Sequence, residues 1–142
     1  MTMQIDDTLG YLICRTARKV HRHIEKIFSP YGLTLEQWVA MKILAETPDI
    51  SQKELSAQMK RDANTVKAIV DRLIKKDYVR RELNPSDRRA FLLQLTKAGQ
   101  LLVDKLAAAD EQENRQLEEK LGEADTVSMK KMLLQIEEMI RE

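Results

Sequence analysis

The sequence is poor in cysteine, glycine, proline and aromatic residues. Its 142 residues include one Cys, four Gly and three Pro, and aromatic side chains make up 4%. The single Cys14 excludes an internal disulfide and a zinc site built from cysteines. Few Gly and Pro, together with 33% charged residues, favour a helix-rich, well-solvated protein over a β-sandwich or barrel.

Long hydrophobic runs are also absent. No apolar run approaches the ~18 residues of a membrane span, and the N-terminus lacks a basic segment followed by an apolar one, the pattern of a signal peptide. We therefore expect a cytoplasmic protein with no membrane partner. The length and a hydrophobic content of 43% allow one domain, or a small domain with extensions.

Charge is distributed unevenly along the chain, although the net charge is only +1. Residues 51–91 hold 11 Lys/Arg and 6 Asp/Glu, a local charge of +5, whereas residues 104–142 hold 6 and 11, a local charge of −5. A basic centre suits a protein that places one surface against a polyanion. Charge also fluctuates along any protein surface, so this pattern alone does not decide the function.

Residues 62–76 are expected to form a helix with two different faces. Val66, Ile69, Val70 and Leu73 recur at the spacing of a core-facing stripe. The opposite face is polar, and basic near the start of the helix, with Asn64, Lys67, Ala68, Asp71 and Lys75. Such a helix can bury one side in a protein and present the other to the edges of base pairs.

Two capped helices are predicted before this central helix. Thr34-Leu-Glu-Gln37 and Ser51-Gln-Lys-Glu54 both have the pattern of a capping box. The first helix should run to about Glu46. The second is short, and the turn at residues 60–61 joins it to the central helix, which Asp62 caps. Two helices joined by so short a turn are typical of a helix-turn-helix, although an ordinary helical hairpin is commoner.

A two-stranded hairpin is predicted after the central helix. Residues 78–83 and 90–95 alternate in the manner of strands, and residues 84–87 have turn composition. Arg88 and Arg89 follow the turn, so the hairpin tip carries arginines. Because a lone hairpin is marginal in water, this one must lean on the preceding helices.

Long amphipathic helices are expected at both ends of the chain. The first covers residues 7–29, with Asp6 or Asp7 as its cap. Another begins after Thr96, runs for about 25 residues and is broken by Gly122. The final helix has an apolar stripe formed by Met129, Met132, Leu133, Ile136, Met139 and Ile140. These stripes exceed what one small core needs, so we expect a homodimer; a monomeric three-helix core is the alternative.

The order of elements, the caps and the hairpin resemble the MarR (multiple-antibiotic-resistance regulator) family of bacterial transcription factors. The most specific segments are Asn84-Pro-Ser-Asp-Arg-Arg89 and Leu95-Thr-Lys-Ala-Gly99. The resemblance implies a mainly α fold with a small β-hairpin, in which a winged helix-turn-helix is flanked by dimerisation helices. The expected divisions are residues 1–31, 32–96 and 97–142. It also implies a homodimeric repressor on a pseudo-palindromic operator, released by a small aromatic or other low-molecular-weight effector.

The DNA contacts are expected at three places. Asn64, Thr65 and Lys67 can contact base edges or phosphates, and Ala68 can lie against a thymine methyl group. A helix start suits a phosphate, which places Ser51, Gln52 and Lys53 on the DNA backbone, with Lys75 and Arg88 as further backbone contacts. The resemblance places Arg89 in the minor groove and gives Asp87 the task of holding the wing. Asp71 can pair with a wing arginine.

An effector site is predicted with less support. Tyr11, Arg15, Trp38 and Met41 could line a cleft for a small ligand, but the sequence cannot separate this from packing in the core, which we favour. Cys14 matches no sensing position of relatives that detect peroxides, so we expect it to pack in the dimer core. His21 and His23 lie two residues apart and cannot chelate one metal from one helix turn.

No catalytic constellation and no cofactor motif is present. The sequence therefore predicts a protein that is not an enzyme. The alternative to a DNA-binding regulator is a winged-helix module that binds another protein, which the arginines of the hairpin and the basic centre argue against.

Overall fold

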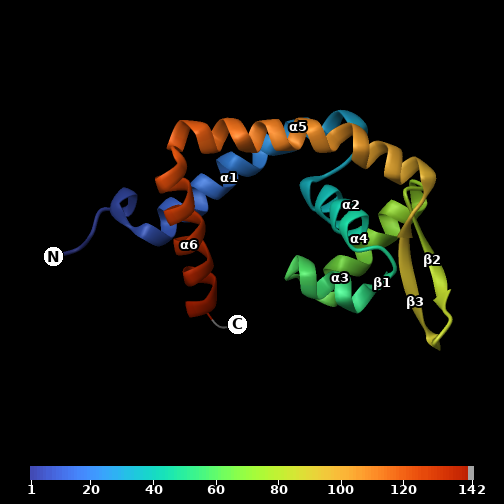
Figure 1. Ribbon diagram of the computed structural model, residues 1–142. Coiled ribbons are helices and arrows are strands. Elements are labelled where there is room, and N and C mark those ends of the chain that lie inside the picture. The colour runs from blue at the N-terminus through green and yellow to red at the C-terminus, as the bar shows by residue number, and fades with distance from the viewer. Residues whose placement is uncertain (141–142) are drawn as a thin grey trace. The chain divides into compact units, whose positions relative to one another are not determined.

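The computed structural model describes residues 1–140 and contains six α-helices and three strands within that range (Figure 1). The elements are η1 Ile5–Asp7, α1 Leu9–Phe28, η2 Ser29–Tyr31, α2 Leu35–Glu46, β1 Ile50–Ser51, α3 Gln52–Met59, α4 Ala63–Lys75, β2 Val79–Asn84, β3 Asp87–Leu95, α5 Lys97–Leu121 and α6 Glu123–Met139. The chain forms two compact units that divide within α5, after Ala107. No helix of the described residues is both long and apolar enough to cross a bilayer.

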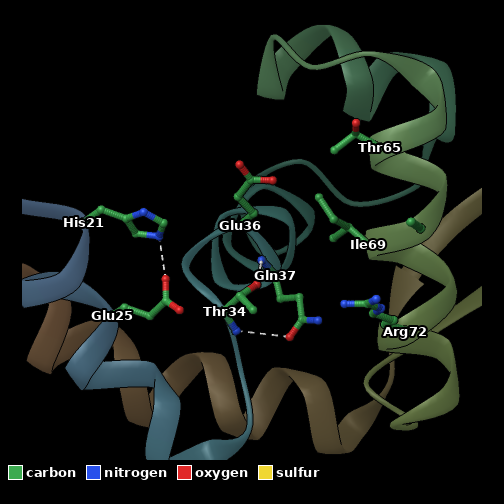
Figure 2. A pocket seen from close by; sticks show the side chains of 9 residues that line it. His21, Glu25, Thr34, Glu36, Gln37, Thr65, Ile69 and Arg72 are labelled. Carbon is green, nitrogen blue, oxygen red and sulfur yellow. Dashed lines mark hydrogen bonds and ion pairs between the residues drawn. The ribbon is translucent and has the colours of Figure 1, made fainter. Parts of the chain in front are cut away.

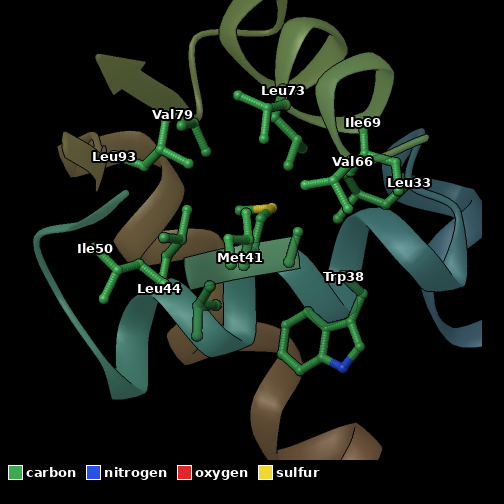
Figure 3. Packing of buried hydrophobic residues seen from close by; sticks show 14 of the residues in the cluster. Leu33, Trp38, Met41, Leu44, Ile50, Val66, Ile69, Leu73, Val79 and Leu93 are labelled. Atoms are coloured by element: carbon green, nitrogen blue, oxygen red, sulfur yellow. The ribbon is translucent and has the colours of Figure 1, made fainter. Parts of the chain in front are cut away.

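The core of the first unit lies among α2, α3, α4 and the sheet (Figure 3). Met41 and Leu55 are fully buried there, and Val66, Ile69, Val70 and Leu73 of α4 are all buried. The predicted core face of the central helix is therefore confirmed. Burying one face of α4 fixes the direction in which its polar face points.

The first predicted capping box is confirmed, and of the second only the Ser51 cap is present. The Thr34 hydroxyl accepts from the Gln37 N–H (3.1 Å), and the Gln37 side chain accepts from the Thr34 N–H (3.2 Å). At Ser51 the hydroxyl accepts from the Glu54 N–H (3.1 Å), but the Glu54 carboxylate bonds that same hydroxyl rather than the backbone. Ser51 belongs to β1, whose backbone pairs with a neighbouring strand.

The turn between α3 and α4 has the predicted cap. Lys60 adopts the left-handed conformation (φ 54°) that ends α3. Asp62 then accepts from the Thr65 N–H (3.0 Å) and the Thr65 hydroxyl (2.6 Å), which satisfies a free N–H group of the first turn of α4. These bonds set the position at which the exposed face of α4 begins.

The sheet has three antiparallel strands in the order β1-β3-β2, one more than predicted. The additional strand β1 has two residues, paired with Leu92 and Leu93 of β3. Strand β3 also begins earlier than predicted, at Asp87, so Arg88 and Arg89 belong to the strand and Pro85 and Ser86 alone form the turn.

The start of α5 is fixed against the base of the hairpin. The Thr96 hydroxyl accepts from the Gly99 N–H (3.0 Å) and donates to the Asp77 carbonyl (2.6 Å), so the predicted cap is present. A Cβ atom on Gly99 would lie 2.1 Å from the Tyr78 carbonyl oxygen. Only glycine allows this close approach.

The long helix α1 is mostly exposed. Its predicted cap was wrong: the residue before the helix is Thr8, whose hydroxyl bonds the Ile5 carbonyl, while Asp6 pairs with Arg15 (3.2 Å). Among the residues of α1 only Phe28 is buried, stacked on the Trp38 ring with centroids 4.9 Å apart. The apolar stripe is therefore largely open to solvent in a single chain.

The second unit consists of the end of α5 and all of α6. Gly122 (φ 90°) separates the two helices, as predicted. Thr126 is the one buried residue of α6, and its hydroxyl donates to the Glu118 carbonyl (3.3 Å). The apolar side chains of α6 are exposed or, for Ile136, half-buried.

Candidate nucleic-acid interface

The polar face of α4 is exposed at its first two turns. Asn64, Lys67 and Ala68 are exposed, whereas Thr65 is half-buried and its hydroxyl is engaged by Asp62. An amide, a cation and a methyl group thus lie exposed on one helix face. These are the groups that contact adenine, guanine or phosphate, and thymine in the major groove.

Asp71 joins this face to the hairpin. Its carboxylate accepts from the Lys67 ammonium (2.8 Å) and from the Arg81 guanidinium of β2 (2.7 Å). Hydrogen bonds from Lys67 first and Arg81 second hold the pKa of the Asp71 carboxyl below its ordinary value. Arg81 also donates to the Gln52 side chain (3.4 Å). One guanidinium therefore links α3, α4 and β2.

Arg81 is a residue that the sequence analysis missed. The alternation of β2 already placed it on the same side as buried Val79, so the signal was present. Its neighbour Arg80 lies on the other face and donates to Gln94 (2.8 Å) and pairs with Glu82 (3.0 Å). The two adjacent arginines thus have different partners.

The start of α3 is less open to a phosphate than the sequence implied. The Ser51 hydroxyl is held by Glu54, whose carboxylate lies 3.2 Å away, and Gln52 contacts Arg81. Lys53 is exposed. Lys75 is also exposed at the end of α4, while the next residue, Lys76, contacts the Gly32 carbonyl and Gln37.

The hairpin tip presents two arginines to solvent. Arg88 and Arg89 are exposed, and the side chain of Arg89 is 93% accessible. Asp87 accepts from the Arg89 N–H (3.0 Å) and from its guanidinium (3.4 Å), and Asn84 accepts from the Ser86 N–H (2.9 Å). These local bonds shape the turn and leave the arginines projecting.

An open hollow lies between α3, α4 and the hairpin. Its lining combines cations with apolar side chains: Ser51, Gln52, Lys53, Lys67, Asp71, Arg81, Ala90, Phe91 and Leu93. Three residues predicted at the start of α3 and two predicted on α4, Lys67 and Asp71, therefore surround one surface. Arg88, Arg89 and Asn64 do not line it.

The four residues predicted for an effector cleft do not form one. Met41 is fully buried and Trp38 is 3% exposed, because α2 lies in the middle of the core. Tyr11 and Arg15 instead contact each other on α1, with the guanidinium 5.5 Å from the ring centroid. The burial of Trp38 and Met41 agrees with the core packing that the sequence favoured over a ligand cleft.

A different hollow lies among α1, α2 and α4 (Figure 2). Its lining is mixed in charge: His21, Glu25, Thr34, Glu36, Gln37, Thr65, Ala68, Ile69 and Arg72. His21 Nε2 lies 2.5 Å from the Glu25 carboxylate. The same hollow reaches Thr65 and Ala68, two of the residues predicted to contact DNA.

The described part of the chain holds no cluster of three or more His, Cys, Asp or Glu side chains arranged for a metal ion. Cys14 is exposed on α1. Its predicted place in a dimer core is a property of two chains, and it stays a prediction.

A capped helix, a three-residue turn, an exposed second helix and a hairpin carrying arginines define a winged helix-turn-helix protein. Residues 33–91, which run from just before α2 into β3, match the model of the MarR family. An HTH-type transcriptional repressor of Mycobacterium tuberculosis (Rv2887) is 27% identical over 108 residues, covering 76% of this chain and 78% of the relative.

Two solved structures show the same fold. CouR from Rhodococcus jostii, bound to p-coumaroyl-CoA, is 26% identical with a TM-score of 0.82 over 95% of both chains. The MepR–DNA complex of Staphylococcus aureus is 18% identical with a TM-score of 0.87, covering 97% of this chain and all of the other. The resemblance extends beyond the winged part to almost the whole chain.

Proposed function

We propose that this protein is a sequence-specific transcriptional regulator that binds double-stranded DNA as a homodimer and represses its target. The observation that carries the proposal is the pairing of two exposed features on one rigid unit. These are the free polar face at the start of α4 and the projecting arginines of the wing. The former suits the major groove and the latter the adjacent minor groove.

The proposed roles follow from exposure and chemistry. Asn64, Lys67 and Ala68 contact bases, Arg89 enters the minor groove, and Arg88, Lys53 and Lys75 contact phosphates. Asp71 and Asp87 hold the wing, because each binds an arginine of it. Thr65 contributes through its methyl group or backbone, since its hydroxyl is engaged by Asp62.

The relatives named above include a repressor, a regulator bound to DNA and one bound to a small ligand. By analogy, we place an effector in the hollow of Figure 2. A ligand there would contact Thr65 and Ala68 and exclude DNA from the same residues. A regulator of this kind acts in the cytoplasm and needs no catalytic group.

The test is in vitro selection of DNA from a random duplex pool, followed by footprinting. We expect a pseudo-palindrome with half-sites about one helical turn apart. Recovery of no preferred sequence, with equal binding to every duplex, would contradict the proposal. The DNA upstream of the protein's own gene is the natural first candidate for a gel-shift experiment.

A further inference from the structure

The wing carries an exposed apolar pair that the proposed contacts do not use. Leu83 and Phe91 are directly opposite each other across β2 and β3 and are 60% and 48% exposed. They lie on the same sheet face as the buried Val79 and Leu93, since alternate residues share a face. The core-facing side of the sheet therefore continues outward as an exposed apolar surface.

Cations flank this surface on two sides. Phe91 lines the hollow that also contains Lys53, Lys67 and Arg81, and Arg88 and Arg89 follow the turn at the tip. The lining of the hollow keeps a net positive charge, because it holds the Asp71 carboxylate against the cations of Lys53, Lys67 and Arg81. A purely apolar partner would leave that charge uncompensated, and a simple anion would leave the ring in water. The matching partner alternates negative charges with C–H groups, which is the chemistry of a sugar-phosphate strand.

The position of the hollow specifies which strand this is. If α4 occupies the major groove and the wing the adjacent minor groove, the backbone that separates the two grooves passes between α4 and the wing. That is where the hollow lies. We infer that Phe91, supported by Leu83, packs against the deoxyribose carbons of this strand, while Lys53 neutralises a phosphate beside it.

This inference rests on the proposed DNA-binding function, and it makes a distinct physical prediction. A cation on a phosphate releases counterions, so its removal lowers the slope of log affinity against log salt by about 0.9 per phosphate. An apolar contact with a sugar releases none. Loss of Phe91 should therefore weaken binding equally at low and high salt.

The experiment compares full-length variants on one duplex selected by the wild-type protein. Phe91→Ala should bind about tenfold more weakly per half-site, the effect of uncovering roughly half of a phenyl ring, with an unchanged salt slope. Phe91→Leu should stay within about twofold. Lys53→Ala should lower the slope. Hydroxyl-radical cleavage, which attacks deoxyribose, should expose the sugar between the two grooves only in Phe91→Ala.

The matched control is Leu92→Ala, on the same strand but the opposite face. An equal loss of affinity in this control would show that wing order, not a contact, is affected, and would overturn the inference. So would wild-type affinity, or a reduced salt slope, in Phe91→Ala. If the wild-type protein shows no salt-dependent binding to any duplex, the proposed function fails as well, which separates the two results.

Discussion

Two regions of the molecule differ in where their apolar side chains lie. The winged part buries them: α2, α3, α4 and the sheet form a closed core in which Met41, Leu55 and Leu73 are fully or almost fully inaccessible. Helices α1 and α6 expose most of theirs. Phe28 is the one buried residue of α1, and α6 buries no hydrophobic side chain among its described residues. The winged part forms a closed core within a single chain, whereas the apolar stripes of α1 and α6 stay exposed in a single chain.

This difference in burial indicates that the winged part serves DNA binding and that the exposed helices serve as an interface. A closed core holds the DNA-contacting groups rigidly, which a binding site requires. An extended apolar surface on a helix marks an interface. Because one winged unit offers few base contacts, a second copy of the same chain is the partner that would add the most.

The largest expected loss of operator affinity comes from a charge placed on the apolar stripe of α6. Leu133→Glu places a charge on the exposed stripe of α6, and we expect monomers at concentrations where the wild type is dimeric. Operator affinity should fall by about a hundredfold or more, because two linked half-sites are no longer bound together. Sedimentation equilibrium and a binding titration measure the two quantities.

Lys131→Glu is the control for that variant, since it lies about 200° around the helix from Met129 at the centre of the stripe. It should leave the dimer intact. A dimeric Leu133→Glu with full affinity would contradict the assignment of α6 to the interface.

The next effect comes from the wing. Arg89→Ala should weaken operator binding about ten- to a hundredfold (~1–3 kcal/mol) and lower the salt slope by about one, while the dimer survives. Arg80→Ala is the matched control, because that guanidinium is engaged by Gln94 and Glu82 on the other face. Equal losses in both variants would refute a specific role for Arg89.

A smaller and more selective effect is expected at α4. Asn64→Ala removes an exposed amide that can pair with adenine. We expect about a fivefold loss on the selected operator (~1 kcal/mol) and relaxed preference at one position of each half-site. Repeating the selection with the variant tests this, and an unchanged sequence preference would place Asn64 outside the recognition surface.

The smallest effect concerns Asp71 and pH. Its folded-state pKa is lowered by Lys67 and Arg81, so its stabilisation is fully present above the ordinary carboxyl pKa. That stabilisation is lost as the pH falls through the lowered value. The difference in free energy of unfolding between wild type and Asp71→Asn should therefore shrink on acidification.

Urea unfolding at several pH values provides the measurement. A pH-independent difference for Asp71→Asn would mean that the two ion pairs do not stabilise the fold.

Local sequence patterns predicted much of this fold. Caps at Thr34 and Asp62 and the core spacing of α4 depend on neighbouring residues, so they can be recognised in the sequence. The strand β1 could not be, because two residues have no periodicity and pair with β3 about 40 residues away. The pairing of Asp71 with a wing arginine was anticipated, but the choice of Arg81 depends on strand register.

The site residues also divide into those that a local pattern predicts and those whose environment depends on tertiary packing. The exposure of Asn64 and Arg89 could be predicted locally, because Asn64 lies on the polar face of one helix and Arg89 lies next to the turn of one hairpin. Core packing of Trp38 and Met41 was favoured from the sequence, but their almost complete burial follows from packing around α2 on several sides. The strand pattern places Phe91 and Leu93 on one face, but it does not show that the core covers Leu93 and leaves Phe91 exposed.

The most direct test of the central claim is a competition titration at physiological salt. The selected operator competes against a shuffled duplex of the same composition for the full-length protein. We predict that the operator binds at least about a thousandfold more tightly and that Arg89→Ala and Asn64→Ala both reduce this ratio. Equal affinity for the two duplexes would contradict the account.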